Sequence, residues 1–299
     1  MREKKLLRRT SRSFYLTIRL LPRCLRSDIT LAYLLARATD TIADTSTAPV
    51  EQRLDLLRAA QRSLNQGKME GYDPQTWIRF QRDPSEAALL ERLPDLWSAM
   101  QGCDTSVQTL IADLMDRILE GQIFDLTRFH EGASPLTMHE LERYTYLVAG
   151  CVGEFWHELC RLKLGDYDTS SSEAMKSRAR HYGQALQLVN IIRDRNMDHA
   201  LGRIYLPSDD VPRAVRQARE WLGEGTDYCA AVRSGRLRYA TLLPTLLGFR
   251  TLNLCEAQPS GMLTPVKVPR AEVRRWMRRA LPVWWSSASV IALARRAAA

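Results

Sequence analysis

The chain has 299 residues, of which 45% are hydrophobic and 26% charged, and its formal net charge is +9. This length allows one large domain or two ordinary ones. No stretch approaches the ~18–20 apolar residues of a membrane-spanning helix, and the charged start from Met1 to Lys5 argues against a secretory signal. The six cysteines form no CxxC pair, so we expect reduced thiols in a cytoplasmic protein.

The basic charge balance suits three kinds of partner: nucleic acid, an anionic membrane surface or a polyanionic small substrate. The sequence has neither zinc-finger spacing nor an RNP-like motif. We therefore expect no nucleic-acid partner.

Helical periodicity runs through almost the whole chain, broken by short turn signals such as Asp83-Pro84 and the segment 132–135. Residues 66–86 resemble a longer surface connection. No strand-loop-helix pattern carries a GxGxxG or P-loop motif, and no repeat is evident. We expect one all-α domain over residues 1–299 and a monomer.

The first informative helix covers residues 31–44. At about 100° per residue, one narrow sector is apolar and contains Leu31, Leu35, Ala38 and Ile42. The opposite side is polar and contains Tyr33, Arg37, Asp40 and Asp44. Asp40 and Asp44 lie one turn apart, where like charges weaken a helix slightly. A metal site is one interpretation, and an amphipathic surface helix with a solvated acidic end is the other.

A second helix contains Tyr144 and the small residues Ala149, Gly150 and Gly153. Small side chains either allow helices to pack tightly or leave room for a ligand. Periodicity alone favours tight packing here.

The third helix repeats the acidic spacing within residues 183–198. One stripe of about 80° is polar or small and contains Gly183, Gln187, Asn190, Asp194 and Asp198. The other sides are mostly apolar, which indicates a buried helix. Because buried, unpaired carboxylates are costly, the stripe must face polar groups or a wet cavity, and Gly183 indicates close approach by a neighbour. A buried hydrogen-bond network is the alternative to a metal site.

Together these helices suggest a cavity with two carboxylate pairs, apolar walls and arginines. Mg²⁺ prefers oxygen ligands and binds through a few carboxylates together with substrate phosphates. The chemistry that fits is metal-assisted departure of diphosphate from an apolar substrate, with dry walls that tolerate a carbocation.

At these residues the chain resembles the squalene/phytoene synthase family of head-to-head prenyl transferases. The matching segments are Thr10–Phe14, Tyr33–Asp44, Tyr144–Gly153, Gln187–Asp198 and Gly202–Pro207. The Asp-Thr-x-x-Asp form at 40–44 is more similar to squalene synthases than to phytoene synthases, which commonly show Asp-Asp-x-x-Asp.

The resemblance implies an all-α isoprenoid-synthase bundle with a central cavity lined by the two aspartate-rich helices. It implies Mg²⁺, with Mn²⁺ as an alternative, and farnesyl diphosphate as the substrate. Implied metal ligands are Asp40, Asp44, Asn190, Asp194 and Asp198. Implied substrate-binding residues are Arg12, Ser13, Phe14, Tyr33, Arg37, Gln187, Asn190, Arg193 and Arg203. The four aspartates would ionise one substrate, and Tyr144 would assist proton loss that closes the cyclopropane of presqualene diphosphate.

The resemblance also implies a second, reductive half-reaction in which NADPH supplies hydride to give squalene. Val266 to Arg270 resembles a basic segment near the cofactor phosphates, which makes Lys267 and Arg270 candidate cofactor ligands. A solvated basic turn is the alternative.

The C-terminal segment, residues 271–299, combines six arginines with Trp276, Trp284 and Trp285. It either rests on an anionic membrane surface, on the inner face of the membrane, or packs on the domain as a helix with solvated arginines.

Two other functions remain open. A non-reductive relative would make dehydrosqualene, phytoene or presqualene diphosphate. A non-catalytic basic helical protein would bind membrane or nucleic acid, and it would be indifferent to Asp40→Ala or Asp194→Ala.

Overall fold

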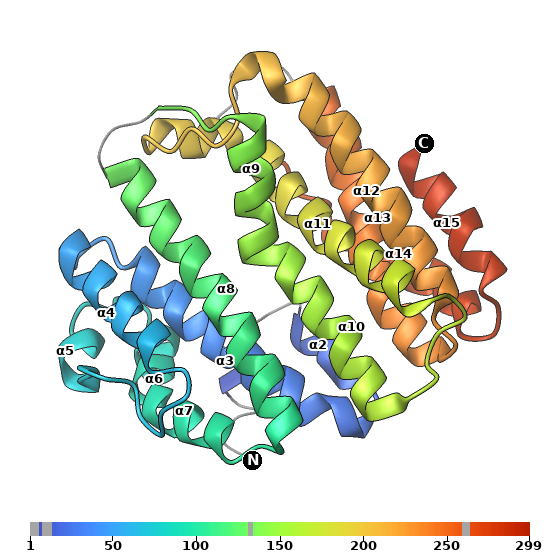
Figure 1. Cartoon of the computed structure of the whole chain (residues 1–299). Helices are drawn as coiled ribbons and strands as arrows, with labels where there is room; N and C mark the ends of the chain where they lie inside the picture. Colours follow the sequence, from blue (N-terminus) through green and yellow to red (C-terminus); the bar gives the residue numbers. More distant parts are fainter. Residues whose placement is uncertain (1–5, 8–13, 131–133, 259–263) are drawn as a thin grey trace. The chain divides into compact units, whose positions relative to one another are not determined.

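The computed structural model describes residues 6–7, 14–130, 134–258 and 264–299 (Figure 1). Within these ranges the regular structure is helical, apart from one isolated bridge between Asp168 and Val232. The prediction of an all-α chain is confirmed. The chain forms two compact units, Met1–Glu131 and Gly132–Ala299. A single domain over 1–299 stays a prediction.

The first unit contains the helices from α2 to α8. They are α2 (Phe14–Leu20), α3 (Arg23–Asp44), α4 (Val50–Arg62), α5 (Pro74–Ile78), α6 (Pro84–Glu91), α7 (Leu93–Gln101) and α8 (Thr105–His130).

Helix α3 is the centre of this unit, where it packs against α4, α6, α7 and α8. Its predicted apolar face is buried, with Leu35, Ala38 and Ile42 fully covered. Helix α4 holds the acidic C-terminal end of α3 in place, because the buried Arg53 of α4 donates from Nη1 to the Ala43 carbonyl oxygen at 2.6 Å. Such a contact satisfies one of the carbonyls that a helix leaves unpaired in its last turn.

The segment 66–86 is more structured than expected. Asp73 caps α5 by accepting from the backbone N–H groups of Gln75 and Thr76, and Pro74 occupies the first helical position. Asp83 and Pro84 begin α6 in the same way. An acidic cap followed by proline is a helix-start signal, and the expectation of a plain connection overlooked it.

The second unit contains longer helices and three short irregular turns. They are α9 (Met138–Thr145), the π-helix η1 (Tyr146–Gly150), α10 (Cys151–Leu164), α11 (Ser172–Ala200), the 3₁₀ turn η2 (Ser208–Asp210), α12 (Val211–Ala231), α13 (Gly235–Ala257), α14 (Arg270–Arg279), the 3₁₀ turn η3 (Leu281–Trp284) and α15 (Ala288–Ala298).

Helix α11 is the centre of the second unit. It contacts α9, η1, α10, α12 and α13, and Figure 1 shows it between α10 and α12. Leu188, Val189, Ile191 and Ile192 are buried, which confirms the prediction that this helix is apolar on its remaining sides and covered by neighbours.

The C-terminal segment packs on the unit. Helix α14, η3 and α15 all contact α13, and Trp276, Val283 and Val290 are buried. The segment thus packs on the unit as helices, and the arginines of α14 stay exposed. Contact of this segment with a membrane stays a prediction. None of the helices in the described part combines the length and the apolar character needed to cross a bilayer.

Candidate active site

The first aspartate pair lies on the last turns of α3 with an arginine beside it. Arg37 donates from Nη1 to Asp40 Oδ2 at 2.5 Å and from Nη2 to Glu86 Oε1 of α6 at 2.8 Å. Tyr33 and Asp40 are half-buried and Asp44 is exposed. Arg37, the expected diphosphate ligand, therefore holds two carboxylates in this structure.

Negative charge is concentrated around Asp40. Burial raises the pKa of its carboxyl to about 6, and repulsion from Asp44 and Asp125 adds to the rise while Arg37 opposes it. Asp125 lies on α8, which packs against α3. Sequence reasoning missed Asp125 because it belongs to no spaced pair and lies far from Asp44 along the chain.

The neighbourhood of Asp125 also contains an orphaned polar atom. Gln122, one turn earlier on α8, is buried, and its Oε1 accepts no hydrogen bond from the described residues. Carboxylates that repel one another, with an unpaired amide oxygen one turn away on α8, are the kinds of oxygen donor that a hard divalent cation such as Mg²⁺ prefers.

Protein side chains alone do not complete a metal site here. Among the described residues, no three His, Cys, Asp or Glu side chains lie close enough to hold a metal ion. A Mg²⁺ ion at these aspartates would need further oxygens from substrate or water, which is how Mg²⁺ commonly binds.

The second aspartate pair lies on the last turns of α11. Gln187, Asp194 and Asp198 are half-buried and Asn190 is exposed. Arg193 binds Asp194 through two bonds, from Nε to Oδ1 at 2.8 Å and from Nη2 to Oδ2 at 2.5 Å. This two-pronged contact is the arrangement in which a guanidinium binds a carboxylate most strongly.

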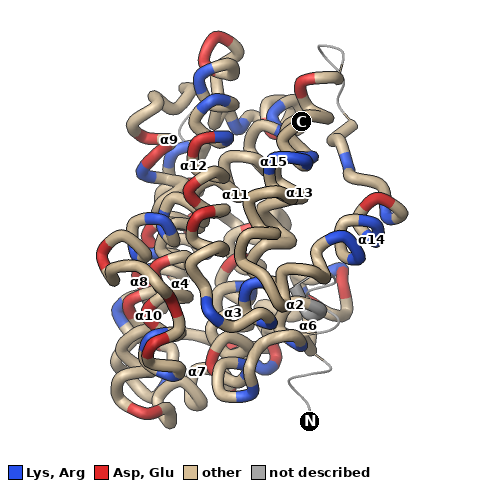
Figure 2. Tube along the Cα trace, turned by 90° about the vertical axis from the view of Figure 1, so that its right-hand side faces the viewer, with Lys and Arg blue, Asp and Glu red and all other residues tan. Residues whose placement is uncertain are grey.

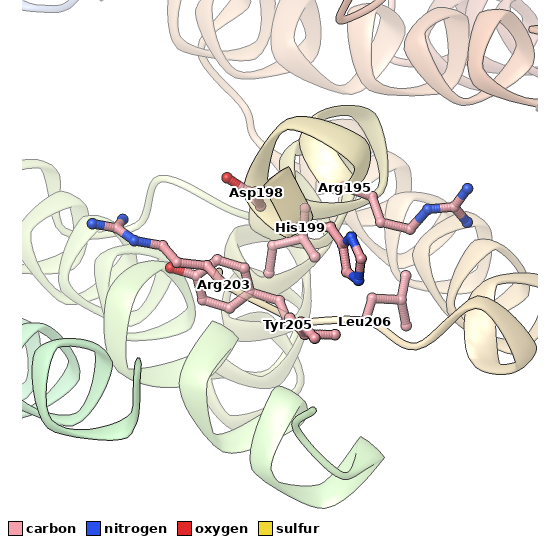
Figure 3. Close-up of a pocket in the computed structure, with 8 residues that line it drawn as sticks. Arg195, Asp198, His199, Arg203, Tyr205 and Leu206 are labelled. Carbon is pink, nitrogen blue, oxygen red and sulfur yellow. The ribbon is translucent and has the colours of Figure 1, made fainter. Parts of the chain in front are cut away.

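A turn after α11 places Arg203 near Asp198. The helix ends at Ala200, and Gly202 adopts a φ of +78°, a conformation that glycine adopts without strain. The Arg203 N–H then donates to the Asp198 carbonyl oxygen at 2.8 Å. In Figure 3 the side chains of Asp198 and Arg203 point to one side of the helix end, and Arg195 points to the other.

Beneath this turn is a small pocket of about 10 Å³, close to the minimum for one water molecule. Asp198, Arg203 and Tyr205 are among its lining residues. Tyr144, at the end of α9, is buried and stacks on Tyr205 with ring centroids 5.2 Å apart. The structure thus brings the predicted Tyr144 to the segment that follows the second aspartate pair, and it adds Tyr205, which sequence reasoning gave no role.

Glycines let the helix that follows Tyr144 cross α11 closely. A Cβ on Gly153 would lie 1.9 Å from the Ala179 carbonyl oxygen, and one on Gly183 would lie 2.1 Å from the Ala149 carbonyl oxygen. Real Cβ atoms do not approach backbone oxygens so closely, so only glycine fits at either position. The prediction of tight packing at these small residues is confirmed.

The remaining candidates lie elsewhere along the chain or outside the described part. Lys267 and Arg270 are exposed, and Arg270 is the first residue of α14. Arg12 and Ser13 lie outside the described residues. Phe14 begins α2, and its side chain lies outside the described part.

A comparison with known protein families identifies the family of this chain. The model of the squalene/phytoene synthase family matches residues 7–215. The chain belongs to this family. The expected resemblance to this family is confirmed.

Curated relatives include both kinds of synthase. The chain is 31% identical over 207 residues to a bifunctional lycopene cyclase/phytoene synthase of Blakeslea trispora, covering 68% of this chain and 31% of that protein. It is 29% identical over 210 residues to squalene synthase of Schizosaccharomyces pombe, covering 69% of this chain and 43% of that protein. The chain thus spans less than half the length of these two relatives.

Solved structures share the fold. TcSQS in complex with the ligand BPH1237 matches with a TM-score of 0.79 at 22% identity, over 99% of this chain and 89% of that chain. A dehydrosqualene synthase in complex with a ligand matches with a TM-score of 0.62 at 21% identity, over 93% of both chains. The predicted isoprenoid-synthase helical fold is confirmed.

Proposed function

We propose that this chain is a squalene synthase that condenses two farnesyl diphosphates to presqualene diphosphate and then reduces this product to squalene. The observation that carries the proposal is an arginine bound to the first aspartate of each motif, Arg37 with Asp40 and Arg193 with Asp194. Each pair can exchange partners when a metal-bound diphosphate arrives. The carboxylate then faces the cation, and the guanidinium faces phosphate oxygens.

Two groups of residues would hold Mg²⁺: Asp40 and Asp44 on α3, and Asn190, Asp194 and Asp198 on α11. When bound, Mg²⁺ neutralises charge on the departing diphosphate and so assists ionisation. The released guanidinium groups would keep the diphosphate oriented, together with Arg203.

Tyr144 is the candidate for assisting proton loss during cyclopropane closure. Its burial and its stacking on Tyr205 support this role, because a ring held between helix and loop presents its hydroxyl in a fixed direction and excludes water. The released diphosphate is the candidate proton acceptor.

The reductive step is supported by the Asp-Thr-x-x-Asp form of the first motif and by squalene synthases among the relatives, such as the human enzyme at 29% identity over 213 residues. NADPH is the proposed hydride donor. Lys267 and Arg270 are the proposed contacts to its phosphates, since both cations are exposed and only three residues apart.

A non-reductive synthase is the second candidate. Its support is the phytoene synthase relative from Blakeslea trispora and the dehydrosqualene synthase of similar fold. Both candidates share the ionisation chemistry of the aspartate motifs, and they differ in whether a hydride reaches the condensed product.

One assay distinguishes them. Purified protein is incubated with farnesyl diphosphate and Mg²⁺, with and without NADPH, and extracted lipids are identified by mass. Squalene that forms only with NADPH is the expected result. Dehydrosqualene or presqualene diphosphate accumulating despite NADPH would overturn the reductive assignment, and a parallel incubation with geranylgeranyl diphosphate tests the phytoene alternative.

Variants Asp40→Ala and Asp194→Ala control for the non-catalytic alternative. Both should stop diphosphate release while the protein stays folded by circular dichroism. Wild-type protein that releases no diphosphate at all would reject both synthases.

A further inference from the structure

An exposed basic and aromatic surface lies at the C-terminal end of the second unit, on elements to which the proposed chemistry assigns only Arg270. Helix α14 turns Trp276 inward and keeps Arg274, Arg275, Arg278 and Arg279 exposed. At about 100° per residue these arginines and Arg270 fall on one half of the helix circumference. Figure 2 shows the basic residues following one another along α14.

No carboxylate of α14 lies on this exposed face. The one acidic residue of the helix, Glu272, is turned inward, where it accepts from Arg250 Nε at 2.7 Å and from Trp276 Nε1 at 3.3 Å. These bonds hold Glu272 on the packed side, and its Oε1 also lies 3.8 Å from Nη2 of the exposed Arg275, where it offsets part of that charge. The exposed half of α14 therefore presents positive charge to solvent.

Large apolar side chains adjoin the basic face. In the next turn, Leu281 is 47% exposed, and Trp285 is 82% exposed. The neighbouring Trp284 is partly covered and contacts Tyr239 edge-on. The three tryptophans therefore differ in exposure. Packing covers Trp276 and part of Trp284, and it leaves Trp285 in water.

We propose that this surface, formed by Arg274, Arg275, Arg278, Arg279, Leu281 and Trp285, binds anionic lipid bilayers. Arginines attract acidic headgroups, and a tryptophan beside them inserts at the boundary between headgroups and acyl chains. A polyanion such as nucleic acid would satisfy the arginines but gives no reason for Leu281 and Trp285 to be exposed together. The membrane surface accounts for both the charge and the apolar side chains.

The test is partition of the full chain onto vesicles, measured by sedimentation. Phosphatidylcholine vesicles should bind little protein, and vesicles that also contain phosphatidylglycerol should bind it. Each surface arginine contributes about fivefold to such binding, so R274Q/R278Q should lower the partition coefficient by about 25-fold. Brominated lipid should quench tryptophan fluorescence in the wild type and less in Trp285→Phe.

The matched control is R295Q/R296Q, which removes the same charge from exposed positions on α15. It should change partition by less than about threefold, since the proposed surface is on α14 and η3. Equal losses in both double variants would mean that binding follows net charge, and would overturn the proposal. Absence of binding to phosphatidylglycerol vesicles would overturn it as well.

Two further measurements separate membrane binding from polyanion binding and from the enzyme activity. Binding of a DNA oligonucleotide as tight as that of vesicles, and unaffected by Trp285→Ala, would identify a polyanion surface and not a membrane surface. Diphosphate release from detergent-dispersed farnesyl diphosphate should be the same in R274Q/R278Q and wild type. Failure of the membrane proposal and failure of the proposed enzyme activity are therefore distinguishable.

Discussion

Arg193 shows how much of the proposed chemistry depends on one planar side chain. It forms two bonds to Asp194, and the same fork matches two phosphate oxygens. Arg193→Lys keeps the charge and removes the fork. We expect kcat/KM for farnesyl diphosphate to fall about 10- to 100-fold, because a hydrogen bond to a charged group contributes about 1.5–3 kcal/mol.

Arg195→Lys is the matched control on the same helix. Arg195 lines the same small pocket, but Figure 3 shows its side chain pointing away from Asp198 and Arg203, so this variant should retain wild-type kcat/KM. Equal losses in the two variants would contradict a specific role for Arg193.

Asp125 places a further negative charge beside the first aspartate pair. Its carboxylate and that of Asp44 both raise the pKa of Asp40, so two negative charges act on Asp40. Removing one of them weakens the attraction for a divalent cation. We expect Asp125→Asn to raise the Mg²⁺ concentration for half-maximal diphosphate release by about 10-fold, in the range seen when partners of metal ligands are removed.

Asp113→Asn is the comparison for Asp125→Asn, since Asp113 is exposed on the same helix. Its Mg²⁺ dependence should equal that of the wild type. An unchanged Mg²⁺ dependence in Asp125→Asn would show that this carboxylate does not contribute to the ion site.

His157 connects stability to pH. It is fully buried, its Nδ1 lies 2.5 Å from the Tyr167 hydroxyl, and its Nε2 has no hydrogen-bond partner among the described residues. Burial lowers the pKa of this imidazole. Below about pH 6.5 the unfolded chain takes up a proton that the folded chain resists, so the free energy of unfolding should decrease as the pH falls.

Urea unfolding at several pH values measures this effect. The contribution of His157 to the free energy of unfolding should be constant above pH ~6.5. It should decrease as the pH falls from that value to the lowered pKa of His157 in the folded chain. In His157→Gln, which cannot titrate, the slope in this window should be smaller. An identical slope would assign the pH dependence to other groups.

At the scale of elements, the crossing of α10 and α11 depends on glycine. In Gly153→Ala the new Cβ would meet the Ala179 carbonyl at 1.9 Å, so the backbone must shift. Overpacking of this kind costs about 1–3 kcal/mol, and we expect an equal loss in the free energy of unfolding by urea.

Gly223→Ala in α12 tests the opposite case, a helical glycine that has room for a Cβ. Apart from the adjoining backbone of its own helix, no atom lies within 4 Å of a Cβ built at Gly223, and alanine is favoured over glycine in a helix by about 0.5–1 kcal/mol. This variant should be more stable than the wild type. Destabilisation by both substitutions would mean that steric contact at Gly153 is not the cause.

Periodicity predicted the faces of α3 and α11 because each helix buries one continuous side and keeps its acidic stripe out of the core. It did not predict η1, because the residues Tyr146–Gly150 carry no sequence signal that separates the i→i+5 hydrogen bonds of a π-turn from α-helical bonding. Packing selects that turn: Gly150 lies against Gln184, and Gln184 donates to the Glu142 carbonyl at 3.1 Å. Asp125 escaped notice for a related reason, because only tertiary packing brings α8 to α3.

At the scale of the whole molecule, the basic charge is unevenly placed. Seven arginines and one glutamate lie between Arg270 and Ala299, so this short segment supplies most of the net charge of +9. The remainder of the chain is far closer to neutrality. The overall charge therefore reflects the C-terminal segment more than the aspartate motifs with their arginines.

This placement predicts two different responses to salt. The arginines of α14 are exposed, and the Debye length shortens from ~30 Å at 0.01 M to ~10 Å at 0.1 M salt, so partition onto anionic vesicles should fall many-fold. Arg37 and Arg193 are only 28% and 31% exposed, and partly buried pairs are screened much less. Over the same range, kcat/KM for detergent-dispersed farnesyl diphosphate should change by less than about threefold. Potassium chloride and potassium glutamate should give the same result at equal ionic strength. A parallel decline of both quantities would show that substrate capture and membrane binding depend on the same exposed charges.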